Sequence, residues 1–312
     1  MTTQSNPLPE SPSGSQAIAP QVMSATRPMY WSIRRELWEN RSIYVAPVIA
    51  ASVGMLAFLL SMIYLPSMTG HTTHDPVSGL INLAMPYGHI AWLFILTSFT
   101  VGVFYSLEAL HGERRDRSIL FWKSLPVSDL TTVLSKASIP LAVLPVLVFA
   151  MFAALQLPML ALNILALLLR GESASRLWSQ LPLFQMQLTL LYSVTVIALW
   201  HAPIYGFLLL VSGWARRAAF LWAVLPLLAV VAFERLAFRT SHFASLLIDR
   251  LIGFAGRAFA LETPGGIDPH FVPVTQLTPL RFLSSPGLWI GLVLAAIFLT
   301  AAVRLRRSRG PI

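Results

Sequence analysis

"IYVAPVIAASVGMLAFLLSMIYL", Ile43–Leu65, is a continuous apolar run without a charged side chain. A helix must carry about 20 mainly apolar residues to cross the hydrocarbon core of a bilayer, so this stretch predicts a membrane-spanning helix. The composition of the chain supports this, because 11% of its 312 residues are charged, whereas soluble domains carry about 25%. We therefore expect a polytopic membrane protein.

Apolar runs of similar length recur along the chain and predict an all-α fold with six transmembrane helices. Residues 1–28 are rich in Pro, Ser and Gly and are predicted to be a disordered tail. Residues 239–286 separate the last two spans, and their apolar residues near helical spacing predict a helix that lies on the outer membrane surface or caps the bundle. The transmembrane domain is predicted to cover residues 42–309, with spans at about 43–65, 86–107, 138–167, 183–213, 218–238 and 288–304.

The 22 Lys and Arg residues set the expected orientation, because the cytoplasmic loops of membrane proteins are enriched in them. With six spans, most of these residues fall on the side of the two termini, so both termini are predicted to be cytoplasmic. An alternative has seven spans, in which "HAPIYG", His201–Gly206, forms a turn within the long uncharged stretch 177–215. Six spans are favoured because the basic tail "RLRRSRG", Arg304–Gly310, directly follows the last span and then lies inside.

A short segment before the first span mixes Trp with Arg and Glu. This segment, "MYWSIRRELWENR", Met29–Arg41, has the spacing of an amphipathic helix that lies in the membrane interface and is anchored by its Trp residues. The alternative is a plain cytoplasmic extension of the first span.

The loop after the second span concentrates charge in an otherwise apolar chain: "GERRDRSILFWKSLPVSD", Gly112–Asp129. The second span is expected to continue as a helix beyond the membrane, where Glu108, His111 and Glu113 emerge into water. A short transverse helix is expected next, and then a turn and a second helix.

Two residue patterns support these helices inside the loop. Asp116 or Ser118 is a candidate N-cap of the transverse helix. Ser128 is a candidate N-cap of the helix that follows, with Asp129 favourable in its first turn. The transverse helix would expose large apolar side chains ringed by Arg and Lys, which suits a protein interface. A basic loop on anionic lipid headgroups fits the same residues equally well.

Catalytic signatures are missing from the sequence. It contains no P-loop for nucleotide phosphates, no H-E-x-x-H or G-x-S-x-G motif, and no cysteine. His71, His74 and Asp75 in "HTTHD" are weak candidates for metal ligands. Glu234, an acid within a predicted span, is either a structural residue near the outer interface or a proton-coupling residue, and the structural role is favoured.

At the charged loop the chain resembles the permease subunits of ABC-2 type ABC transporters. The matching pattern is a second span that leads into "GERRDRSILFWKSLPVSD" and then "VLSKA", which opens the third span. A second likeness is "LLLVSGWARRAAFLWAVLPLLAV", Leu208–Val230, which joins the fourth and fifth spans. The resemblance covers roughly Tyr30–Arg307.

The resemblance implies the membrane subunit of an ATP-driven exporter in the cytoplasmic (inner) membrane of a bacterium. Such a chain pairs with a second permease, as a homodimer or a heterodimer, and contacts membrane lipids but no nucleic acid. It is not itself an enzyme and holds no cofactor, because a separate ATPase subunit binds ATP and Mg²⁺. The segment Met29–Arg41 would be the elbow helix of the family.

The resemblance also implies that the transverse helix is a coupling helix that docks in a groove of the ATPase. Phe121 and Trp122 would be its apolar anchors, and Arg115, Arg117 and Lys123 would meet acidic residues of the partner. The docking residues would be Arg114, Arg115, Asp116, Arg117, Ser118, Ile119, Leu120, Phe121, Trp122, Lys123 and Ser124.

Two rival functions remain at this stage. An ion-coupled secondary transporter needs buried charged groups within the membrane, for which the sequence offers little beyond Glu234. A membrane-bound enzyme or maturation factor would use the His residues of "HTTHD" on the outer side.

Overall fold

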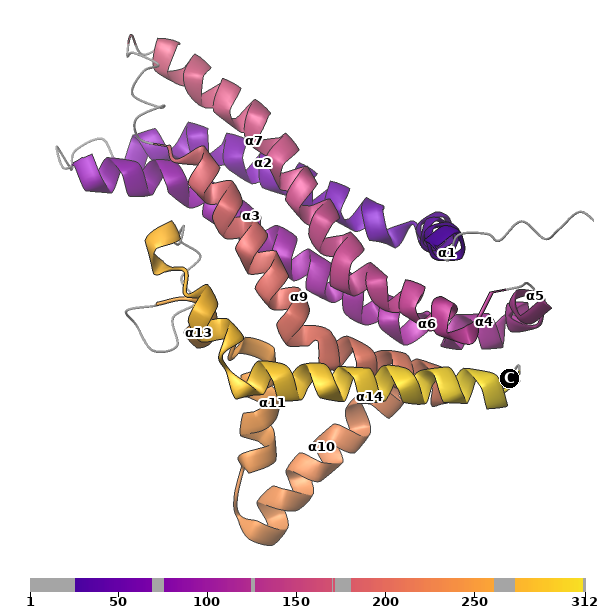
Figure 1. Ribbon diagram of the computed structural model, residues 1–312. Coiled ribbons are helices and arrows are strands. Elements are labelled where there is room, and N and C mark those ends of the chain that lie inside the picture. Colours follow the sequence, from indigo (N-terminus) through magenta and orange to yellow (C-terminus); the bar gives the residue numbers. More distant parts are fainter. Residues whose placement is uncertain are drawn as a thin grey trace, which may run out of the picture.

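The computed structural model is a bundle of long helices (Figure 1). It describes residues 26–68, 76–124, 127–169, 171, 181–260 and 273–310 of the chain. Within these ranges the single β contact is an antiparallel bridge between Phe259 and Leu277.

Six helices in the described part of the chain are long and apolar enough to cross a membrane, which confirms the predicted number. Their cores are uncharged, and their lengths follow from the apolar runs of the sequence. They are α2 (Ser42–Met68), α3 (Pro76–Glu108), the joined elements α6 (Asp129–Ser138), η1 (Ile139–Val143) and α7 (Leu144–Leu169), then α9 (Leu183–Trp214), α10 (Ala219–Phe238) and α14 (Pro286–Ser308).

The third of these spans begins earlier than the apolar run suggests. Ser128 is its N-cap, as predicted, because the Ser128 hydroxyl accepts a hydrogen bond from the backbone N–H of Thr131 at 3.0 Å. The helix therefore starts at Asp129, and Lys136 lies inside α6 with only 2% of its side chain exposed. A π-helical turn, η1, then leads directly into α7.

The fourth span is one continuous helix, α9, so the turn considered at His201–Gly206 does not form. The ribbon of α9 changes direction near its middle (Figure 1). Pro203 lies inside α9 and lacks the N–H of a helix hydrogen bond, which is the usual cause of such a bend.

α9 is the central helix of the bundle. In its most apolar window 67% of the residues are buried, against 11% in α10. It packs along α14, where Gly206 allows close approach, since an added Cβ there would come within 3.3 Å of the Ala295 carbonyl oxygen. Small residues at helix interfaces serve the same purpose in other membrane bundles.

The segment between the last two spans contains α11 (His242–Ile252), α12 (Ala255–Ala258), η2 (Val274–Gln276) and α13 (Pro279–Leu283). Phe254 and Phe259 from this segment join Trp200 of α9 and Leu288 of α14 in one buried cluster. The segment thus packs against two spans through an apolar core.

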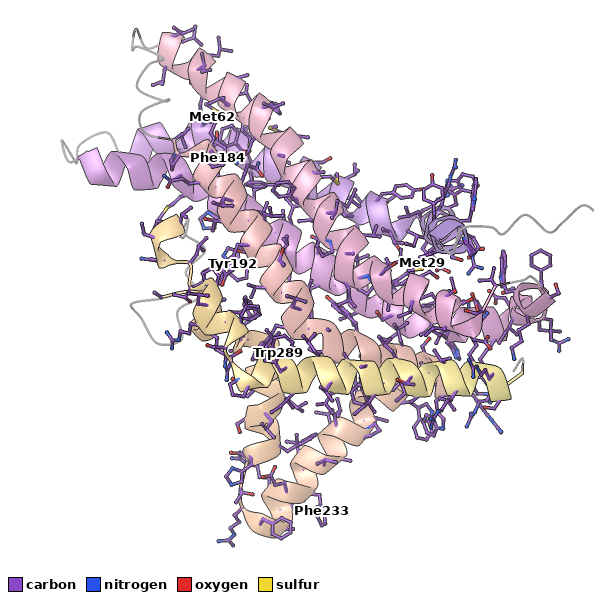
Figure 2. All side chains as sticks on the ribbon, viewed as in Figure 1. Met29, Met62, Phe184, Tyr192, Phe233 and Trp289 are labelled. Carbon is purple, nitrogen blue, oxygen red and sulfur yellow. The ribbon has the colours of Figure 1, made fainter. Side chains whose placement is uncertain are left out.

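α10 and α11 project together from the bundle (Figure 1). Figure 2 shows Phe233 near the tip of this pair, pointing away from the other helices. Glu234 accepts hydrogen bonds from the Thr240 hydroxyl at 2.8 Å and from the backbone N–H groups of His242 and Phe243 at 2.7 and 2.8 Å. This carboxylate therefore closes the turn from α10 to α11, in line with the structural role favoured above.

One end of the bundle gathers the charged segments. We call it the charged end, and it comprises α1 (Thr26–Glu39), α4 (His111–Arg115), α5 (Ser118–Ser124), the start of α6 and the last turn of α14 (Figure 1). The expectation that the helix of the second span emerges into water holds for Glu108, which is exposed where α3 ends, but it is wrong for His111 and Glu113, which are buried in α4. The burial of Glu113 is compensated by the ion pairs described next, and Nδ1 of His111 lies 3.2 Å from the carbonyl oxygen of Ala215.

Candidate functional site

The short helix α5 presents apolar side chains outward at the charged end. Arg117, just before it, has a left-handed backbone with φ of 58°, which turns the chain between α4 and α5. Ile119 points inward and is 1% exposed, whereas Leu120 and Phe121 are each 59% exposed. One side chain therefore fixes α5 to the protein, while two large apolar side chains remain uncovered.

Trp122 is held beneath a side chain of α1. The guanidinium carbon of Arg35 lies 3.9 Å from the centroid of the Trp122 ring, which is a close cation–π contact. Phe121 meets the edge of the same ring, with the two ring centroids 4.9 Å apart. Because Trp122 is half-buried in this stack, the exposed apolar surface of α5 is formed mainly by Leu120 and Phe121.

Arg35 is itself fixed by two buried carboxylates. Its Nη2 atom lies 2.6 Å from Oε1 of Glu36 and 3.0 Å from Oε1 of Glu113. Glu36 belongs to α1 and Glu113 to α4, so Arg35 joins the helix before the first span to the loop after the second. The stack of Trp122 on Arg35 connects α5 to the same group of charges.

Lys136 lies between the two carboxylates. Its Nζ atom is 2.8 Å from Oε1 of Glu36 and 3.1 Å from Oε1 of Glu113. The Tyr105 hydroxyl of α3 donates a further hydrogen bond to Oε2 of Glu36 at 2.8 Å. A lysine at the start of an apolar span is thus paired within the protein, and its burial is compensated.

The C-terminal end of α14 completes the cluster. Arg306 donates from Nη1 to Oε2 of Glu113, and its Nε atom forms an ion pair with Oδ1 of Asp129 at 3.1 Å. Arg306 is only 6% exposed. The last span is therefore tied to the loop after the second span and to the first turn of α6.

These groups balance one another in charge: three bases face three acids. We call them the ion cluster, and its members are Arg35, Glu36, Glu113, Asp129, Lys136 and Arg306. Buried charges are tolerated when they are paired and hydrogen-bonded. The cluster thus fixes four separate chain segments in one arrangement at the charged end.

Glu36 stays ionised within the ion cluster. Burial acts to raise the pKa of its carboxyl group, but the nearby charges of Lys136 and Arg35 and the hydrogen bonds from Lys136 and Tyr105 outweigh burial and hold this pKa below its usual value. The carboxylate is therefore the stable form at neutral pH.

The structure separates the predicted docking residues into three groups. Arg114 and Ile119 are buried and contact this chain, and Ser118 and Trp122 are partly buried. The exposed ones are Arg115, Asp116, Arg117, Leu120, Phe121, Lys123 and Ser124.

The exposed charges of this group have weak local partners. Arg115 pairs with Glu108 at 2.8 Å and with Asp116 at 3.2 Å, and Lys123 donates to the Arg309 carbonyl oxygen at 3.3 Å. Exposed ion pairs contribute little to stability, so these side chains are available to a partner.

The weak metal candidates His71, His74 and Asp75 lie outside the described residues. Among the residues that the structure describes, no group of three His, Cys, Asp or Glu side chains could hold a metal ion.

Sequence reasoning missed the ion cluster, although it singled out several of its members separately. A local signal was present, because Lys136 stands alone in "VLSKASIP", next to an apolar run. A single base at that position needs either water or a buried acid, and the pattern does not say which.

Comparisons of the chain with protein-family models, with characterised proteins and with solved structures found no match. The function is therefore inferred from the sequence and from the geometry of the charged end.

Proposed function

We propose that this chain is the transmembrane permease subunit of an ATP-driven exporter of the ABC-2 type. A separate ATPase subunit docks on α5, and a second permease copy or a homologous permease completes the transporter. The charged end faces the cytoplasm of a bacterial cell, and the exporter moves a substrate across the cytoplasmic membrane. Its six apolar helices provide the membrane part, and the partner ATPase binds ATP and Mg²⁺.

The observation that supports this function best is an exposed pair of apolar side chains on a short helix that other contacts hold in place. Leu120 and Phe121 are each 59% exposed, on a seven-residue helix too short to cross a membrane. Basic side chains flank the pair, while Ile119 and Trp122 fix the helix from below. Interfaces between proteins are commonly built in this way, with a few large apolar anchors surrounded by charged groups.

The ion cluster supplies a route for mechanical coupling. A displacement of α5 acts on Trp122, and through the stack on Arg35 it reaches Glu36 in α1 and Glu113 in α4. Lys136 and Arg306 extend the same connection to α6 and α14. We infer that the closure of an ATPase pair shifts these elements as one body and tilts the attached spans.

The surroundings of Glu234 favour this function over an ion-coupled transporter. Glu234 caps the turn between α10 and α11 with three accepted hydrogen bonds, so its carboxylate is committed to structure. Among the described residues, the paired acids and bases of the ion cluster belong to the elements of the charged end, where they balance in charge.

The test is a co-purification with the ATPase encoded by a neighbouring reading frame. In the variant Leu120→Asp/Phe121→Asp, two carboxylates replace the exposed apolar pair; the edge contact of Phe121 with the Trp122 ring is lost, while Ile119 and the stack of Trp122 on Arg35 are left unchanged in sequence. We expect this variant to lose the ATPase during purification in detergent while it elutes as a folded permease. A matched control is Leu280→Asp, an equally apolar and 84% exposed position on α13, away from the charged end.

ATPase binding that is unchanged in the double variant would reject the docking role of α5. A gene neighbourhood without any Walker-type ATPase, combined with an unbound permease from native membranes, would reject the exporter itself.

A further inference from the structure

A second group of basic side chains lies at the charged end, apart from the ion cluster. Arg114 donates from Nη1 to the carbonyl oxygens of Gly213 and Ala215, at 2.7 and 3.2 Å. Arg309 donates from Nη1 to the carbonyl oxygen of Trp214 at 3.0 Å. Two guanidinium groups from distant parts of the chain thus meet at three successive carbonyl groups, where α9 ends.

Two further arginines follow immediately. Arg216 and Arg217 occupy the link between α9 and α10, and both are exposed. Arg216 and Arg309 both repel Arg114 electrostatically. We call Arg114, Arg216, Arg217 and Arg309 the arginine cluster.

Most of the positive charge of this cluster is not neutralised by nearby acids. Among the described residues, the nearby acids are paired with bases outside this cluster: Asp129 with Arg306 and Arg307, and Glu108 and Asp116 with Arg115. The end of α9 itself offers about half a negative charge through its helix dipole. Four guanidinium groups against about half a charge leave a strongly positive site, which attracts an anion.

The position of the cluster at the ends of two spans indicates which kind of anion it attracts. The link from α9 to α10 runs only from Ala215 to Ala218, so its arginines cannot extend far from the ends of two spans. Trp214 and Trp222 stand beside it with ring centroids 4.8 Å apart, and they are 41% and 47% exposed. Exposed Trp side chains at the ends of spans mark the headgroup layer of the bilayer.

We propose that the arginine cluster binds the phosphate group of an anionic phospholipid at the junction of α9, α10 and the end of α14. The headgroup phosphate lies against the exposed Arg216 and Arg217 beside Arg309, the buried Arg114 adds its positive charge from beneath, and the acyl chains descend beside Trp214 and Trp222. This site requires only that the chain spans a membrane, so it does not depend on the proposed exporter function.

The bound lipid would also bear on the position of α5. Lys123 of α5 donates to the carbonyl oxygen of Arg309 at 3.3 Å, so a phosphate that holds Arg309 in place also steadies this contact.

The experiment uses the full-length protein in neutral detergent and counts bound lipids by native mass spectrometry during titration. The probes are phosphatidylglycerol, phosphatidylcholine with the same acyl chains, and glycerol 3-phosphate, which carries the phosphate without the chains. The variant is Arg216→Gln/Arg217→Gln, at two exposed positions. The control is Arg235→Gln/Arg281→Gln, two exposed arginines outside the charged end.

We expect the wild type and the control to bind phosphatidylglycerol more tightly than phosphatidylcholine. Each arginine near an anionic lipid surface changes affinity about fivefold, so the double variant should bind phosphatidylglycerol roughly 25-fold more weakly.

Three results would overturn the proposal. Equal binding of the two lipids would show no headgroup selectivity. Binding of glycerol 3-phosphate as tight as that of the lipid would indicate a site for free anions. An unchanged phosphatidylglycerol affinity in the double variant would show that Arg216 and Arg217 do not bind the headgroup.

Discussion

Replacing Lys136 with Met tests whether the ion cluster holds the charged end together. The Lys136 side chain is 2% exposed, and its Nζ atom contacts Glu36 and Glu113 at 2.8 and 3.1 Å. Met has a similar length and no charge, so the change removes the ammonium group and little volume. After this change three acids of the ion cluster face two bases, which leaves one uncompensated negative charge in a buried place.

The magnitude follows from these distances. With an effective dielectric constant of about 20, each of the two contacts contributes roughly 5–6 kcal/mol of attraction before the cost of removing the ions from water. That cost is several kcal/mol for each ion, so the net effect is smaller. Breaking a buried ion pair from one side typically destabilises a protein by about 3–5 kcal/mol, and we expect Lys136→Met to fall in this range.

A double variant separates charge balance from packing. Glu36→Gln/Lys136→Met restores equal numbers of acids and bases in the ion cluster, and the Gln amide oxygen still accepts the Tyr105 hydroxyl. We expect this variant to be no less stable than Lys136→Met, with a coupling energy of about 1–3 kcal/mol between the two sites.

The assay is reversible unfolding by sodium dodecyl sulfate in mixed micelles, followed by circular dichroism. The matched control is Arg115→Met, because Arg115 lies at the same 2.8 Å from Glu108 but with both side chains at least half exposed; we expect no measurable change there. A free energy of unfolding for Lys136→Met within about 0.5 kcal/mol of the wild type would refute the reasoning, since that is the scatter of neutral surface changes. Strictly additive single and double variants would refute it as well.

Three further predictions concern other parts of the molecule. The pKa of Glu36 is lowered in the folded protein, so the stabilising effect of the Glu36 carboxylate is complete above its unfolded pKa of about 4.5 and fades as the pH falls below that value. The variant Glu36→Gln should therefore lose less stability than the wild type between about pH 6 and pH 3.5, as measured by acid-unfolding curves. Arg250 of α11 donates to the carbonyl oxygens of Trp200 and Gly287 at 3.3 and 3.1 Å. The variant Arg250→Gln should therefore loosen α11 and make it several-fold more sensitive to protease, unlike Arg281→Gln. Equal cleavage rates in the two variants would show that these hydrogen bonds do not hold α11 in place. A single cysteine at Phe121 or at Leu280 in this cysteine-free chain should react with a membrane-impermeant maleimide from opposite sides of the membrane, and labelling of both from one side would contradict the proposed orientation.

The six long helices could be predicted from the sequence because length and hydropathy alone determine them. A run such as Ile43–Leu65 has no other way to satisfy its backbone within a bilayer. The choice of one helix over a hairpin at His201–Gly206 could also be predicted, since a basic tail directly after the last span is expected on the cytoplasmic side, which favours six spans.

The start of the third span was harder to predict from the sequence. A lone charge normally marks the edge of a membrane helix, so the sequence predicts a span that begins after Lys136. The structure instead buries Lys136 with Glu36 and Glu113, which belong to other segments of the chain. No periodicity within one segment can reveal a partner that lies far away in the sequence.

The surface of α5 shows the same limit at the level of single side chains. The sequence identified the short helix and its apolar residues, but it treated Phe121 and Trp122 as equivalent anchors. Arg35 from α1 covers the Trp122 ring, while Leu120 is as exposed as Phe121. The pair available to a partner is therefore Leu120 and Phe121, a distinction that depends on a long-range contact.

The most direct measurement of the docking role is a cross-link from α5 itself. The natural chain has no cysteine, so Phe121→Cys carries one thiol, which can be coupled to a benzophenone maleimide and irradiated in membranes that contain the ATPase of the neighbouring reading frame. We predict one adduct with the combined mass of permease and ATPase, absent when the probe is placed at Leu280. Equal adducts from both positions, or lipid adducts alone from position 121, would contradict it.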